Sequence, residues 1–226
     1  MSDGTGAGVR IAVIDSGVHA DHPHVAGVAG GIAIRADGST GPDYIDRLGH
    51  GTAVTAAIKE KAPAAELYAV RIFEEQLSGN IDVLLRAIEW SAEAGMQLVN
   101  LSLGTANPTH EIALRESVRH AVDRGALIVA ARDEGGVSWL PGALPGVIPV
   151  QLDWDCPRNE YRTCRIDGVN VFRASGYPRE IPGVPRERNL SGISFAVANV
   201  TGLLARLEHA ELASLLTARR LECLGS

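Results

Sequence analysis

The sequence predicts an α/β fold of three layers, in which a mostly parallel central β-sheet is flanked by helices on both faces. Two observations carry this prediction. Apolar runs of strand length alternate with amphipathic segments of helix length, and such repetition is typical of parallel sheets. A chain of 226 residues, 46% of them hydrophobic, is also long enough to bury one substantial core. No linker or internal repeat interrupts the chain, so we expect residues 1–226 to form a single domain.

The expected elements follow one another in a regular order. Strands are expected near residues 9–14, 67–72, 97–103, 126–131 and 146–151. Helices are expected near residues 51–60, 80–94 and 109–124. After residue 151 the composition changes to Cys, Pro, Arg and Gly, with a short strand-like piece at 169–172. Two further helices, 194–205 and 209–222, are expected near the end of the sequence.

Three polar residues stand at the ends of these elements, where open α/β sheets collect their ligand sites. Asp15 ends the first apolar, β-branched run, so a buried strand delivers its carboxylate. His50 lies in the first turn of the first helix. Ser194 begins a later helix, whose free N–H groups and partial positive charge would stabilise an oxyanion.

The chain order Asp15, His50, Ser194 is that of the catalytic residues in subtilisin. The local sequences Asp-Ser-Gly, His-Gly-Thr and Ser-Gly-Ile-Ser also surround them in matching contexts, so the chain resembles the subtilisin-like serine proteases (subtilases, peptidase S8). The resemblance implies one subtilisin-like peptidase domain. It also implies that Ser194 attacks a peptide carbonyl, His50 takes and returns the proton, and Asp15 orients the imidazole.

The resemblance extends to the substrate-binding segments. Ser102, Leu103 and Gly104 match the family's segment that pairs with the substrate backbone. Ala131, Arg132 and Asp133 match a strand and turn that usually read Ala-Gly-Asn, whose Asn donates to the oxyanion.

Two of these positions depart from the family. Asp133 replaces the oxyanion Asn, and an ionised carboxylate there would repel the developing charge, whereas a protonated one would donate to it. Arg132 replaces a Gly of the primary specificity pocket. Either its side chain narrows that pocket and makes it cationic, or it turns to solvent, as Arg usually does.

Composition restricts the partners. The net charge of −6 argues against a nucleic-acid partner. The polar, Gly-rich start lacks the features of a signal peptide, and no apolar run is long enough to span a bilayer, so we expect no membrane partner and a cytoplasmic location. The expected partner is a peptide or protein substrate, and the oligomeric state is not predicted.

No metal or cofactor is expected. His19, His22 and His24 resemble metal ligands, but a His-Pro pair after Asp-Ser-Gly is ordinary for the family. The region after His50 is also shorter than in relatives that hold a tight calcium ion there. The three cysteines are expected to be reduced, with a disulfide between Cys156 and Cys164 as the alternative.

Three functional classes follow from the sequence. The favoured one is a serine endopeptidase that processes a precursor or leader peptide. The second is a peptide ligase or macrocyclase, in which an amine replaces water as the acceptor of the acyl group. The third is a catalytically impaired relative that binds peptides, because Asp133 stands in place of the oxyanion Asn.

Overall fold

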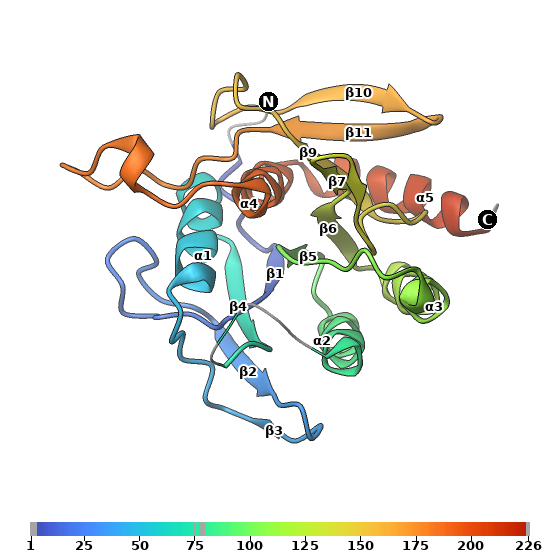
Figure 1. Ribbon diagram of the computed structural model, residues 1–226, viewed down its shortest axis with the longest axis horizontal. Helices are drawn as coiled ribbons and strands as arrows, with labels where there is room; N and C mark the ends of the chain where they lie inside the picture. The colour runs from blue at the N-terminus through green and yellow to red at the C-terminus, as the bar shows by residue number, and fades with distance from the viewer. Residues whose placement is uncertain (1–3, 75, 77–79, 225–226) are drawn as a thin grey trace.

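A computed structural model describes residues 4–74, 76 and 80–224 of the protein (Figure 1). A nine-stranded sheet forms its centre, with the strand order β10-β11-β9-β6-β5-β1-β4-β2-β3. The strands are β1 (Arg10–Asp15), β2 (Gly30–Ile34), β3 (Thr40–Gly41), β4 (Glu66–Arg71), β5 (Leu98–Leu101), β6 (Leu127–Ala131), β9 (Ile148–Leu152), β10 (Arg162–Ile166) and β11 (Val169–Ala174). Neighbouring strands are parallel except at the two edges, where β3 and β10 run antiparallel to β2 and β11. The predicted α/β fold with a mostly parallel sheet is confirmed.

Helices cover both faces of this sheet (Figure 1). They are α1 (His50–Lys61), α2 (Ile81–Glu93), α3 (Glu111–Asp123), α4 (Ile193–Leu204) and α5 (His209–Leu224). Alternate residues of β1 show how the core divides, because successive side chains of a strand point to opposite faces. Ile11 and Val13 pack in one core with residues of α1 and α4, whereas Ala12 and Ile14 pack in the other with residues of α2 and α3. None of the helices in the described ranges is long and apolar enough to cross a membrane.

The outer segments depart from the expected elements. Sequence patterns miss β2, β3 and β10, because β2 begins with two glycines and β10 is largely polar and exposed. A small hairpin of β7 (Asp133–Glu134) and β8 (Val137–Ser138) follows β6, and short 3₁₀ turns form at Pro108–His110 and Arg186–Arg188. The strand expected at 97–103 ends at Leu101, where its pairing with β6 stops, so residues 102–104 leave the sheet.

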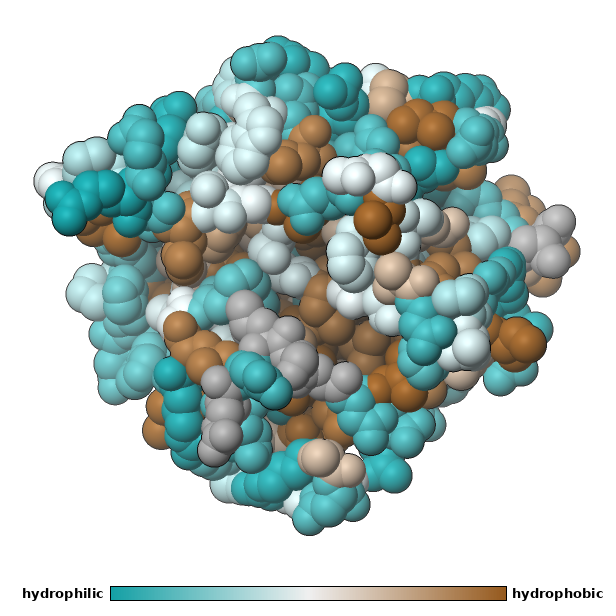
Figure 2. Space-filling view, in the orientation of Figure 1, coloured by the Kyte–Doolittle hydropathy of each residue, from teal (hydrophilic) through white to brown (hydrophobic). Residues whose placement is uncertain are grey.

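The parallel strands place their carboxyl ends along one edge of the sheet, and three segments that carry the expected site residues begin there. These are the turn after β1, the segment after β5 and the turn after β6. Polar side chains cover most of the rim of the face shown in Figure 2, and apolar ones gather around its hollowed centre.

Candidate active site

Asp15 and His50 meet where β1 ends and α1 begins. The Asp15 carboxylate is 1% exposed, and its Oδ1 lies 2.8 Å from Nδ1 of His50. Because an ionised carboxylate only accepts hydrogen bonds, Nδ1 carries the proton and Nε2 is free to accept one. Gly51 permits this close approach, since a Cβ there would lie 2.2 Å from the carbonyl oxygen of Gly17.

A second buried carboxylate holds this junction together. Asp46, which is 2% exposed, accepts a hydrogen bond from the Ser16 hydroxyl at 2.8 Å. Its other oxygen accepts from the backbone N–H and the hydroxyl of Thr52 at 2.9 and 2.6 Å. The N–H groups of Leu48 and Gly49 complete its set of donors. Asp46 therefore ties the residue after β1 to the first turn of α1, and so positions Asp15 and His50.

These contacts set the protonation behaviour of the site. Burial by itself lowers the pKa of His50, but the hydrogen bond and charge of Asp15 and the charge of Asp46 outweigh it and raise this pKa above its ordinary value of 6.5. Burial alone would raise the pKa of Asp46, yet its hydrogen bonds from Thr52 and the neighbouring backbone hold it below the ordinary value. Asp46 therefore keeps a negative charge close to the imidazole at neutral pH.

Ser194 reaches the same site from the start of α4. No side chain caps this helix, because Gly192 stands at its N-cap, and the first N–H groups of a helix have no partner within it. The Ser194 hydroxyl donates to the carbonyl of Ser102 at 3.2 Å, and the Ser102 hydroxyl donates to the carbonyl of Ser194 at 3.3 Å. The His50 ring lies 5.8 Å, between centroids, from that of Phe195. The serine is thus fixed beside the segment that follows β5.

A cavity of about 230 Å³ joins these groups. It is lined by His50, Phe73, Ser102, Leu103, Gly104, Ala131, Glu134, Trp139, Ile193 and Ser194. The structure therefore brings the expected residues Ser102, Leu103, Gly104 and Ala131 to the same cavity as His50 and Ser194. Neither the sequence pattern nor the resemblance indicated Asp46 or Trp139. An acidic residue four positions before His50 was the only signal of Asp46.

Arg132 and Asp133 are placed differently from the other predicted site residues. Among the described residues, neither belongs to the lining of this cavity. The Asp133 carboxylate accepts from Arg132 at 2.9 Å and from the Gln151 amide at 2.8 and 3.0 Å. Arg132 also pairs with Asp167, at 2.8 Å, and its side chain is only 19% exposed. Neither expectation for Arg132, a cationic pocket or a side chain in solvent, describes this position, because two carboxylates hold the guanidinium.

The remaining candidates lie apart from this cavity. His19, His22 and His24 follow β1, and within the described part of the chain no group of three or more His, Cys, Asp or Glu residues could hold a metal ion. Cys156 and Cys164 form no disulfide with each other in the structure, and Cys156 is buried.

Comparisons with known proteins identify the family of this chain. The model of the subtilase family matches residues 6–143, a region that contains Asp15 and His50 and ends before Ser194. The chain is 31% identical over 218 residues to a thermostable alkaline protease of Halalkalibacterium halodurans, covering 88% of this chain and 56% of that protein. It is 36% identical over 216 residues to subtilisin E of Bacillus subtilis, covering 88% of this chain and 53% of that protein.

The chain thus spans about half the length of the curated relatives it matches. Among solved structures, that of a cold adapted subtilisin-like serine proteinase superposes with a TM-score of 0.70 and 21% identity, over 100% of this chain and 82% of that one. This likeness shows the fold. Because the family model matches more than half of the sequence, the chain belongs to the subtilase family.

Proposed function

We propose that this protein is a serine endopeptidase that hydrolyses peptide bonds through Asp15, His50 and Ser194, and that it acts on a narrow set of precursor or leader peptides. The observation that carries the proposal is the 2.8 Å contact between His50 and buried Asp15, in the cavity that Ser194 also lines. Membership of the subtilase family supports the same chemistry.

The geometry supports the following sequence of steps. The Ser194 hydroxyl first turns from the Ser102 carbonyl towards His50, since Nε2 must accept its proton. Ser194 Oγ then attacks the substrate carbonyl, and the oxyanion meets the N–H of Ser194 at the start of α4. His50, now charged, is stabilised by Asp15 and returns the proton to the leaving amine. Water repeats these steps on the acyl-enzyme and releases the second product.

The size of the cavity supports a narrow substrate range. Trp139 N donates to the Arg132 carbonyl at 2.8 Å, and Leu140 exchanges two hydrogen bonds of 2.9 Å with Thr105. Residues 139–140 therefore link the segment after β6 to the segment after β5, and both segments contribute residues near the cavity. A Cβ on Gly104 would lie 3.4 Å from Cβ of Trp139, so the tryptophan closes the space beside the Ser102–Gly104 segment. We infer that the substrate residue held there has a small side chain.

Labelling with a fluorophosphonate probe tests the proposed nucleophile. The wild-type protein should be labelled, and S194A should not. Loss of the serine or the histidine should also cost about a millionfold in turnover, the size found for subtilisin itself. S138A, a change on the exposed hairpin strand β8, is the matched control and should be labelled normally.

The same preparations separate the alternatives. Folded wild-type protein that resists the probe would support the peptide-binding relative and contradict hydrolysis by Ser194. Where labelling occurs, mass spectrometry of a peptide reaction should show two linear fragments, whereas joined or cyclic products would identify a ligase.

The dependence of kcat/KM on pH tests the charges around His50. Because hydrolysis needs neutral His50 and its pKa is raised, kcat/KM should fall in acid with a midpoint above 6.5. D46N removes one of the negative charges that raise this pKa, so its midpoint should move to lower pH. D37N, in the exposed turn between β2 and β3, should leave the midpoint unchanged. A midpoint that stays in place in correctly folded D46N protein would show that Asp46 does not act on the imidazole.

Substitution of Trp139 tests the narrow cavity. W139A should raise kcat/KM for peptides with a large apolar residue before the scissile bond, relative to peptides with Ala there, by about tenfold or more. W154A, which removes an indole that is 47% exposed and outside the cavity lining, should not alter this ratio. An unchanged ratio in W139A would mean that the tryptophan does not limit the substrate.

A further inference from the structure

A second pocket lies on the other side of the α1 N-terminus and has an unusual charge. Its volume is about 430 Å³, within the range of ligand sites. It is lined by His19, His22, His24, Gly49, Thr52, Ala53, Ala56, Pro178, Arg179, Ile181, Arg188, Asn189 and Leu190. Five of these side chains are basic and none is acidic, in a protein whose net charge is −6. We call it the basic pocket.

Two loops that are far apart in the sequence build the basic pocket around α1. One follows β1 and carries the three histidines, and the other runs from β11 to α4 and carries the two arginines; both lie beside α1 in Figure 1. Arg179 joins them, because its Nη1 donates to the carbonyl of His24 at 2.9 Å. The Asn189 amide in turn donates to the carbonyl of Arg179 at 3.2 Å.

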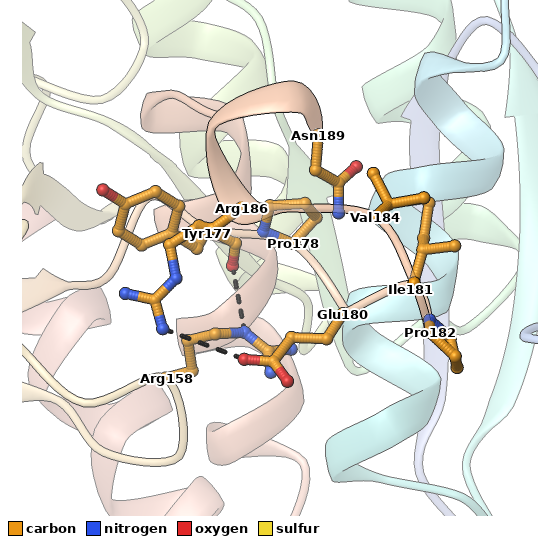
Figure 3. Close-up of a pocket in the computed structure, with 10 residues that line it drawn as sticks. Arg158, Tyr177, Pro178, Glu180, Ile181, Pro182, Val184, Arg186 and Asn189 are labelled. Atoms are coloured by element: carbon orange, nitrogen blue, oxygen red, sulfur yellow. Dashed lines mark hydrogen bonds and ion pairs between the residues drawn. The ribbon is translucent and has the colours of Figure 1, made fainter.

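The arginines of the adjoining pocket, Arg158 and Arg186 in Figure 3, differ from those of the basic pocket because they have carboxylate partners. There Arg158 pairs with Glu60, and Arg186 lies over the Tyr177 ring and 3.8 Å from Glu180. Each of those two guanidinium groups thus lies within ion-pair distance of a carboxylate of the protein. In the described part of the chain, by contrast, neither Arg179 nor Arg188 forms an ion pair with a carboxylate.

His24 adds little positive charge to the basic pocket. Burial, Arg179 and His22 lower the pKa of His24, against the opposing charge of Glu60, so this ring is neutral at pH 7. Arginine side chains stay protonated at every working pH, so Arg179 and Arg188 supply a permanent positive charge to a ligand.

The position of the basic pocket indicates which part of the substrate it would contact. Three residues of the basic pocket are close in sequence to the catalytic candidates: Gly49 and Thr52 to His50, and Leu190 to Ser194. Ser102–Gly104 line the other cavity, on the opposite side of His50 and Ser194. His50 gives its proton to the leaving amine, so the leaving segment must lie on the His50 side. This step rests on the proposed function. The basic pocket is then open to the residues that follow the scissile bond.

We propose that the basic pocket binds a carboxylate of the leaving segment of the substrate, either an Asp or Glu side chain or the chain end, through Arg179 and Arg188. Such a site selects precursors whose sequence is acidic after the cleavage position. It adds a second restriction to the small cavity beside Ser194, on the opposite side of the reacting bond.

Calorimetric titration of S194A with defined peptides tests the proposal without turnover. The probes are acetyl-Ala₄-Glu₄-amide, acetyl-Ala₄-Gln₄-amide and acetyl-Ala₄-Gln₄ with a free carboxylate end. The Glu₄ probe should bind about tenfold or more tightly than the Gln₄ amide, since charge-assisted hydrogen bonds to Arg are strong. Tighter binding of the free-acid Gln₄ probe alone would identify the chain end as the bound carboxylate.

Variants that remove arginine charges test which residues cause the preference for a carboxylate. R179Q/R188Q in the S194A background should abolish it, and R119Q/R124Q, with the same charge change at the exposed end of α3, should retain it. R188Q alone keeps the Arg179 bond to His24 and should show a partial loss. Equal affinities for all three probes, or a preference that survives R179Q/R188Q, would overturn the proposal. Labelling of Ser194 is independent of this titration, so each idea can fail separately.

Discussion

The site depends on one arrangement, in which two buried carboxylates share the junction between β1 and α1. An isolated buried charge costs several kcal/mol, so each carboxylate needs partners that are held in place. The Asp15 carboxylate contacts His50 Nδ1 at 2.8 Å, and the Asp46 carboxylate accepts five hydrogen bonds of 2.6 to 2.9 Å. Because the donors to Asp46 include both Ser16 and Thr52, β1 and α1 cannot shift relative to each other without removing hydrogen-bond partners from the buried Asp46 carboxylate. The orientation and the raised pKa of His50 both follow from this arrangement.

The other parts of the site come from segments that lie far from this junction in the sequence. Asn100 donates to the Ser102 hydroxyl at 2.9 Å and accepts from Thr201 at 3.0 Å, so a buried polar network joins β5 to α4 behind Ser194. The reciprocal bonds between Ser102 and Ser194 extend it to the surface. Two spaces lie near the N-terminus of α1: the cavity beside Trp139, which His50 and Ser194 line, and the larger basic pocket, which neither of them lines. We propose from these two spaces a substrate that is small before the scissile bond and acidic after it.

The sequence predicted the sheet and the residues at its strand ends because burial and periodicity are local signals. Asp15 follows an apolar run, and His50 and Ser194 begin helices, so their positions could be derived before any coordinates. The edge strands β2 and β10 could not, because half-exposed strands carry weak patterns. The environments of Arg132 and Asp133 were not predicted either, because their partners lie far away in the sequence: Asp167 in the turn after β10 and Gln151 in β9. The role of Asp46 depends on contacts that only the folded chain brings together.

Nitrogen-15 NMR of the His50 side chain in the intact protein tests the central claim most directly, because it reports both tautomer and titration. We predict a proton on Nδ1, an unprotonated Nε2 above the pKa of His50, and a titration midpoint above the ordinary value of 6.5. D15N should lower that midpoint, since it removes the main charge that stabilises the imidazolium. An unprotonated Nδ1, or a midpoint below 6.5 in the wild-type protein, would show that Asp15 and Asp46 do not control the His50 imidazole.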